Sequence, residues 1–392
     1  MLKKYYLFFI LIIYSCQYSF CLAPQGLNAL LEIKNIVLFI DYDNSLEEAD
    51  KELSGENLDN FVANLSLETI MVVHTGRDRS RIWKNLVDPV MAKLAERKDI
   101  GKLRYLKVVH DLGSGAFGFD EIGQVITYKT PKHLKQNDMN IIAQSLIDEL
   151  FVEFEGMDLR DKLKSYLKDC KRHATAELDK VKLSKSWSNS NQGKIPVQKL
   201  HLIPEEFRSD DLFGDIFIWN RGNMLTLEFD YVNKEIGIGN RTMNIRERAR
   251  TTIGSKSSTG DPLYYNSHSN AVDVSLAEKG PTVSEIFYKY IEPNLDKNHV
   301  ILISAGDSTG DLSVFKIDFG DYIHLKMFLG NKPEEIEKAL EIPDTFLSSR
   351  KFSIGGLVLL RTINKLIGNN SLTAIELLKN ISSKSNLTEM SQ

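Results

Sequence analysis

Three short apolar segments of this chain, 36–40, 69–73 and 300–304, each end in polar sequence that contains glycine. A continuous run of apolar residues, rich in β-branched side chains, is typical of a parallel strand that is covered on both faces. Helical patterns such as 58–65 and 283–291 lie between these segments. Strands that alternate with helices predict an α/β fold with a doubly wound parallel sheet. The chemistry of such a sheet gathers at the carboxyl ends of its strands.

The residues between the second and third apolar segments have a different pattern. They predict two amphipathic helices over 140–154 and 159–181, a Ser/Asn-rich loop over 184–193, and strands over 215–219, 224–231 and 236–238. This pattern indicates an α+β domain inserted into the parallel-sheet domain. We therefore expect a parallel-sheet core domain over 30–112 and 265–367, an inserted domain over 113–264, and a polar tail over 368–392.

The first residues resemble an export signal. Lys3 and Lys4 precede an apolar stretch over 5–14, and small residues follow as far as Ala23. We expect residues 1–23 to be a signal peptide or an N-terminal anchor, with Cys16 as a candidate lipid attachment site. The protein would then be secreted or periplasmic, touching a membrane only if this segment stays uncleaved or lipidated. The net charge of −4 gives no indication of a nucleic-acid partner.

Two carboxylates follow the first apolar segment directly, in the order Asp41-Tyr42-Asp43. A carboxylate at a strand end can attack phosphorus, and a second one nearby can protonate the leaving alcohol and then deprotonate water. Such a site needs Mg²⁺ to offset its negative charge. A calcium loop is the other interpretation of this spacing, but its sixth position requires glycine and here holds Leu46.

The remaining parts of such a site follow in order along the chain. A hydroxyl for the phosphoryl oxygens comes from Thr75 in Thr75-Gly76-Arg77, which follows the second apolar segment. Lys279 supplies a fixed cation at the predicted start of a helix. Asp307 and Asp311, after the third apolar segment, supply further carboxylates.

This ordered series resembles the four motifs of the haloacid dehalogenase-like phosphatase superfamily, over about residues 34–110 and 265–367. Gly330-Asn331 and Gly355-Gly356 resemble the glycine elements that follow those motifs. The position of the inserted domain resembles the large α/β cap of sucrose-phosphatase-like and trehalose-phosphatase-like members. The chain shares marks with both types, so its motifs do not fix the sugar.

The resemblance implies a Mg²⁺-dependent phosphatase that hydrolyses a small phosphorylated metabolite, expected to be a sugar phosphate, through an aspartyl-phosphate on Asp41. Asp43 would be the general acid–base. Thr75, Gly76 and Lys279 would hold the phosphoryl oxygens. The metal ligands implied are Asp41, Asp43 through its backbone carbonyl, Asp307 and Asp311.

Two alternatives remain open from the sequence. One is a phosphomutase with the same catalytic residues, and the other is a non-catalytic secreted binding protein on the same scaffold. We interpret His74 as structural and Arg77 as a partner of nearby carboxylates. The sequence leaves open whether His268 reaches the site, and whether the cap residues Trp187, Trp219, Arg221 and His201 line a sugar.

Overall fold

The computed structural model describes residues 35–158, 160–184, 198–208, 214–229, 241–268, 270–296, 299–348, 350 and 352–368. The expected signal segment, most of the Ser/Asn-rich loop with Trp187, the expected strand at 236–238 and nearly all of the polar tail lie outside these residues. Within the described part of the chain, no helix is both long enough and apolar enough to cross a membrane.

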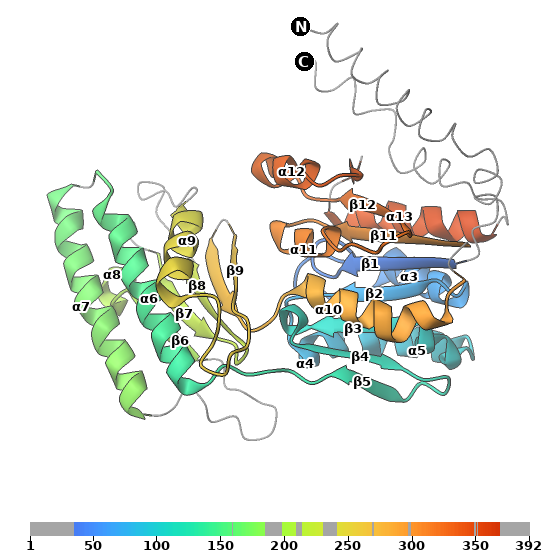
Figure 1. Cartoon of the computed structure of the whole chain (residues 1–392), viewed down its shortest axis with the longest axis horizontal. Helices are drawn as coiled ribbons and strands as arrows, with labels where there is room; N and C mark the ends of the chain where they lie inside the picture. Colours follow the sequence, from blue (N-terminus) through green and yellow to red (C-terminus); the bar gives the residue numbers. More distant parts are fainter. Residues whose placement is uncertain are drawn as a thin grey trace, which may run out of the picture.

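The core domain is built on an eight-stranded sheet in which β1 occupies a central position (Figure 1). β1 pairs in parallel with β2 and with β11, so segments far apart in sequence lie side by side. The predicted doubly wound parallel sheet is thereby confirmed. In spatial order its strands are β13 (Thr345–Leu347), β12 (Ile323–Phe328), β11 (Val300–Gly306), β1 (Asn35–Asp41), β2 (Ile70–His74), β3 (Leu106–His110), β4 (Gly115–Phe119) and β5 (Val125–Lys129).

Both faces of β1 are buried, which explains its continuous apolar sequence. Ile36, Leu38 and Ile40 belong to one hydrophobic cluster, whereas Val37 and Phe39 belong to another. The first cluster includes residues of α3 (Gly55–Ser66), α4 (Arg79–Ile82), α5 (Asp88–Glu96) and α13 (Phe352–Gly368). The second includes residues of α10 (Lys279–Ile286) and α11 (Leu312–Phe315). α12 (Pro333–Leu340) lies beyond β12, and π-helical turns over Trp83–Val87 and Phe287–Ile291 continue α4 and α10.

The inserted domain pairs a second sheet with helices. Its five strands are, in spatial order, β6 (Gln198–His201), β7 (Ile216–Asn220), β8 (Met224–Phe229), β10 (Ala271–Ser275) and β9 (Tyr264–Ser267), all antiparallel to their neighbours. Its helices are α6 (Gln136–Glu155), α7 (Asp161–Ser184), α8 (Glu205–Arg208) and α9 (Arg241–Ile253). The predicted helices over 140–154 and 159–181 therefore correspond to α6 and α7. Figure 1 shows α6, α7 and α9 on the side of this sheet that faces away from the core domain.

The predicted boundaries of the inserted domain, 113 and 264, are wrong at both ends. β4 and β5 pair antiparallel with β3 and extend the core sheet, so the insertion starts after Lys129. β9 and β10 join the small sheet through β8, so the insertion ends only after Ser275. The sequence of a short antiparallel strand does not show which sheet the strand will join. Side chains alternate between the two faces with a period of two residues in either domain.

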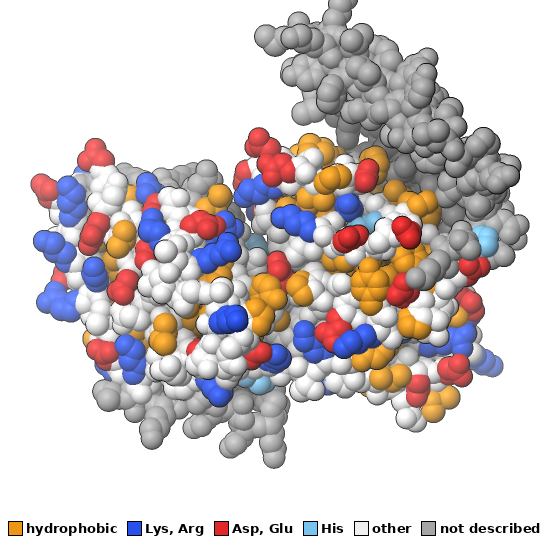
Figure 2. All heavy atoms as spheres, viewed as in Figure 1, with side chains coloured by type: hydrophobic (Ala, Val, Ile, Leu, Met, Phe, Trp, Pro, Cys, Tyr) orange, Lys and Arg blue, Asp and Glu red, His pale blue; other side chains and the backbone are white. Residues whose placement is uncertain are grey.

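Two glycines allow the core segments around the site to approach closely. A Cβ atom on Gly330 would lie 2.2 Å from the carbonyl oxygen of Asp307, and one on Gly356 would lie 1.8 Å from that of Ser45. Any larger residue would push these backbones apart. On the face shown in Figure 2, positive and negative side chains are interspersed over both domains.

Candidate active site

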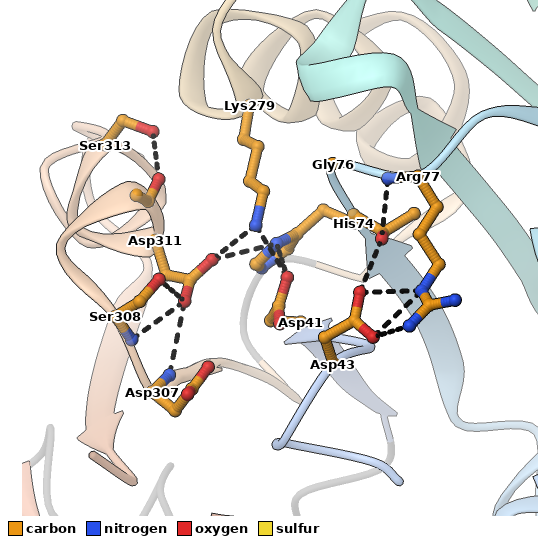
Figure 3. A network of polar contacts seen from close by, with 12 residues as sticks. Asp41, Asp43, His74, Gly76, Arg77, Lys279, Asp307, Ser308, Asp311 and Ser313 are labelled. Atoms are coloured by element: carbon orange, nitrogen blue, oxygen red, sulfur yellow. Dashed lines mark hydrogen bonds and ion pairs between the residues drawn. The ribbon is translucent and has the colours of Figure 1, made fainter. Parts of the chain in front are cut away.

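The predicted catalytic residues meet at the carboxyl edge of the core sheet. Asp41 is the last residue of β1, and its neighbour across the parallel ladder is His74, the last residue of β2. Thr75 follows directly, Asp307 follows β11, and Lys279 is the first residue of α10. Figure 3 shows Lys279 directed toward Asp41 and Asp311, although the three residues are widely separated in sequence.

Lys279 is a buried cation held between two carboxylates. Its Nζ donates to Asp41 Oδ1 and to Asp311 Oδ1, each at 2.6 Å. Burial alone would lower the pKa of Lys279, but the charges of Asp311 and Asp41 outweigh it and raise the pKa. The ammonium of Lys279 therefore stays charged at neutral pH. In this form it can hold the Asp41 carboxylate and attract an anion that enters the site.

Asp311 holds the loop after β11 in place. Its Oδ2 accepts hydrogen bonds from the backbone N–H groups of Asp307 and Ser308, at 3.2 and 3.1 Å, and from the Ser308 hydroxyl at 2.9 Å. Burial opposes ionisation of Asp311, but Lys279 and these donors keep its pKa below the usual value. Both carboxylate oxygens are thus already engaged. This argues against the direct metal ligation expected for Asp311 and favours a supporting role behind Asp307.

Asp307 and Asp41 are two carboxyl groups of the site whose pKa values are raised. Burial, followed by the charges of Asp311 and Asp41, raises the pKa of Asp307 to about 8. Burial and the nearby Asp311 also raise the pKa of Asp41, against the opposing effect of Lys279. Ionisation of all three carboxyl groups would therefore give the site more negative charge than one lysine offsets. Carboxylate oxygens in such surplus are ligands that suit Mg²⁺.

Asp43 points toward Arg77 in the structure. Arg77 Nε lies 2.8 Å from both carboxylate oxygens of Asp43, and the guanidinium Nη2 adds a further contact. The Thr75 hydroxyl donates to Asp43 Oδ2 at 3.4 Å and accepts from the Arg77 backbone N–H at 3.1 Å. Arg77 Nη1 also pairs with the exposed Asp50 at 2.9 Å. The interpretation of Arg77 as a partner of carboxylates is confirmed.

The cap domain reaches the site through the loop after β2 and the loop after β11. Arg221 Nη2 donates to the Gly76 carbonyl oxygen at 2.6 Å. His268, which the sequence left open, lies beside the loop after β11, since a Cβ atom on Gly310 would be 3.7 Å from its Cε1. His268 Nε2 is 3.2 Å from Asp273 Oδ2 on β10. Arg221 and His268 therefore place cap side chains next to the two core loops that carry Thr75 and Asp307.

Sequence reasoning missed His74 as a member of the site. Its ring is fully buried, and its Nδ1 lies 3.6 Å from Asp41 Oδ1 and 3.7 Å from Asp311 Oδ1. The only sequence signal was its position at the end of a predicted strand next to Asp41. In the cap, His201 instead pairs with Asp215 at 2.9 Å.

No protein-family model and no curated protein sequence matches this chain. Several solved structures, however, are similar to this chain in the comparison of structures. A trehalose-6-phosphate phosphatase related protein is 12% identical with a TM-score of 0.41, over 85% of this chain and 99% of the other. Aspergillus fumigatus trehalose-6-phosphate phosphatase is 12% identical with a TM-score of 0.41, over 86% and 96%. Plasmodium falciparum IMP-nucleotidase is 12% identical with a TM-score of 0.43, over 89% and 66%.

These three matches are similar structures only, since the similarity is at 12% sequence identity. The sequence motifs resemble those of the haloacid dehalogenase-like phosphatases, and the core sheet is the α/β fold that this resemblance leads one to expect. Sequence identities of 12% and TM-scores of 0.41 to 0.43 do not indicate which substrate this protein binds. The function has to be inferred from the residues of the site itself.

Proposed function

We propose that this protein is a Mg²⁺-dependent phosphatase that hydrolyses a small phosphate monoester through an aspartyl-phosphate on Asp41. The observation that carries the proposal is the buried contact of Lys279 with Asp41 at the carboxyl end of β1, beside a second carboxyl, Asp307, whose pKa is raised to about 8. A nucleophile, a fixed cation and surplus carboxylates in one place match the needs of phosphoryl transfer.

The chain's own residues account for each step. Lys279, the Thr75 hydroxyl and the Gly76 backbone N–H hold the phosphoryl oxygens while Asp41 attacks phosphorus. The bond to the leaving alcohol breaks, and Asp43 gives that alcohol its proton. Asp43 then takes a proton from water, whose oxygen attacks the aspartyl-phosphate and releases phosphate with Asp41 restored. Mg²⁺, held by Asp41, Asp307 and the Asp43 backbone carbonyl, would offset the negative charge of the phosphoryl group.

Replacement of the nucleophile tests this mechanism. We expect Asp41→Asn, which keeps the shape of the side chain but removes the attacking carboxylate, to abolish phosphate release from a generic aryl phosphate. A chelator should do the same to the wild-type protein, and added Mg²⁺ should restore activity. Asp169→Asn, on the outer helix α7, is the matched control and should leave phosphate release unchanged. Full activity of the Asp41 variant or of the chelated protein would refute the proposal.

For the substrate we propose a sugar phosphate. The support is the sheet face of the cap that α6, α7 and α9 do not cover. Leu225 and Leu227 of β8 pack in the cap core, so Thr226 between them is directed to the opposite face. There the Thr226 hydroxyl donates to Asp273 Oδ1 at 2.6 Å. A buried carboxylate that is already held in place is suited to accept hydrogen bonds from sugar hydroxyls.

An aromatic side chain lies on the same face. Trp219 of β7 has the cations Lys199 and Arg221 over its ring, at 5.2 and 5.5 Å from the ring centre. Its indole N–H is buried and has no hydrogen-bond partner among the described residues. Trp219 and Asp273 lie opposite Thr226 on the two strands that flank β8, so an aromatic ring and a fixed carboxylate share the face of the cap that a sugar ring would cover.

A panel of phosphate esters with Mg²⁺ tests the substrate. We expect hexose and disaccharide phosphates, trehalose 6-phosphate among them, to be hydrolysed with higher kcat/KM than IMP or short-chain alkyl phosphates. A preference for IMP would refute the sugar and keep the phosphatase. An isomerised sugar phosphate without released phosphate would indicate a phosphomutase. Inactivity on the whole panel would favour the non-catalytic binding protein.

We also propose that the protein is exported, with support from the basic and apolar sequence at residues 3–14. Mass spectrometry of the protein purified from its native cells would identify the mature N-terminus. An N-terminus at or before Lys3 would exclude cleavage of a signal peptide.

A further inference from the structure

His74 is a buried histidine next to the proposed nucleophile that the mechanism above does not use. It ends β2 at the position in register with Asp41, and none of its ring is exposed. Its Nδ1 faces the same two oxygens that Lys279 binds, at 3.6 Å from Asp41 Oδ1 and 3.7 Å from Asp311 Oδ1. Two nitrogen groups, from β2 and from α10, therefore converge on one oxygen of the nucleophile (Figure 3).

The ring of His74 is also unsatisfied. Among the described residues, neither of its nitrogens has a hydrogen-bond partner. A buried polar group without a partner destabilises a protein, and an apolar side chain of similar size would avoid this cost. His74 Nδ1 therefore faces the two carboxylates at a separation slightly too long for a hydrogen bond.

A role as metal ligand does not fit the contacts. Asp41, His74 and Asp311 offer ligand atoms within 4.8 Å of one another. Lys279 Nζ, however, lies 2.6 Å from both carboxylate oxygens of this group. The ammonium already occupies the place that a cation bound by these three side chains would take.

We propose that His74 is a positioning residue whose Nδ1–H fixes the orientation of the Asp41 carboxylate during attack on phosphorus. An approach of about 0.6 Å would turn the 3.6 Å separation into an ordinary N–H···O hydrogen bond. Lys279 has to hold both Asp41 and the incoming phosphoryl group, so a second donor on Oδ1 keeps the carboxylate in place when the ammonium shifts toward the substrate. The proposal rests on the proposed phosphatase function, and His74 acts through Asp41 without touching substrate.

The test compares His74→Leu with His74→Asn, because the asparagine amide can place an N–H near the position of Nδ1. We expect His74→Leu to lower kcat for an aryl phosphate by about 10- to 100-fold, the effect of one hydrogen bond to a charged group, with KM changed much less. His74→Asn should recover most of kcat. The Leu variant should melt at or above the wild-type temperature, because it removes an unsatisfied buried group. His324→Leu, at a partly buried histidine of β12 that contacts Ser304 at 2.7 Å, is the control and should keep kcat.

A second measurement does not depend on turnover. Beryllium fluoride with Mg²⁺ mimics an aspartyl-phosphate, and calorimetry reports how tightly Asp41 accepts it. We expect His74→Leu to weaken this binding by about tenfold or more and His74→Asn to restore it. Unchanged kcat and unchanged binding in the Leu variant would overturn the proposal. Equal losses in both variants with lowered melting temperatures would also overturn it and indicate a structural histidine. If wild-type protein releases no phosphate but binds beryllium fluoride, the proposed phosphatase function is refuted. The binding affinities of the two His74 variants then still test whether His74 positions Asp41.

Discussion

At the residue scale, the proposed Mg²⁺ site makes metal binding depend on the proton of Asp307, and so on pH. Its pKa is raised to about 8 by burial and by Asp311 and Asp41, and a metal can bind only the deprotonated carboxylate. We expect Mg²⁺ affinity, measured by calorimetry without substrate, to increase from about pH 6.5 to about pH 8 and to change little above that. Asp307→Asn should bind Mg²⁺ weakly at every pH. Equal affinity of the wild-type protein across this range would show that Asp307 does not ligate the metal.

The same pKa affects the stability of the metal-free protein. A carboxyl group whose pKa is higher in the native state binds more protons there than in the unfolded chain, so stability falls as pH rises between the two pKa values. For Asp307 that interval runs from the ordinary value of 3.8 to about 8. The melting temperature of the chelated protein should therefore fall with pH within this interval, and Mg²⁺ should reverse the decrease.

At the scale of the elements, the contact of α13 with the turn after β1 depends on Gly356. A Cβ atom there would lie 1.8 Å from the carbonyl oxygen of Ser45, which is backbone and cannot rotate away. We expect Gly356→Ala to destabilise the protein by about 1–3 kcal/mol, as overpacking usually does, and to lower activity by displacing the Asp41–Ser45 turn. Chemical denaturation and phosphate release measure the two effects.

Gly156→Ala is the matched control for this prediction. A Cβ atom at Gly156, which caps the end of α6, would meet its neighbours at 3.7 Å or more, an ordinary contact. Gly156→Ala should change neither the free energy of unfolding nor the rate of phosphate release noticeably. Similar stability of the two alanine variants would contradict the role given to Gly356.

The sequence predicted the elements whose burial leaves a mark in it. β1, β2 and β11 are covered on both faces, so their apolar runs were recognisable, and the polar residues at their ends located the site. β4 and β9 were not assigned, because Gly115–Phe119 and Tyr264–Ser267 are short and their partners are chosen by tertiary packing. The missed role of His74 has a similar cause. A lone histidine gives no signal until the register of β1 and β2 places it beside Asp41.

At the scale of the whole molecule, the proposed function divides substrate binding between the two domains. The residues proposed to hold the phosphoryl group lie in the core, whereas Thr226 and Asp273 lie on the cap. We expect Asp273→Asn to lower the preference for a sugar phosphate over an aryl phosphate, taken as the ratio of their kcat/KM values, by about tenfold. The measurement is steady-state kinetics on both substrates. A variant with an unchanged ratio would remove Asp273 from substrate selection.

The pairing of β1 with β11 has a consequence for how the protein is made. β1 leaves the ribosome early, but β11, α10 and the lysine that holds Asp41 are synthesised only after the entire inserted domain. The strand pairings of the small sheet, and the packing of α6 against α7 and α9, lie within the insertion and can form while the core sheet still lacks its central partner. Until β11 has been synthesised and has paired with β1, one side of this apolar strand has free backbone hydrogen-bonding groups. Exposed strand edges of this kind promote aggregation. The site around Asp41 is therefore among the last parts of the chain to form. A nascent chain that ends before Lys279 contains Asp41 but lacks the ammonium that holds it.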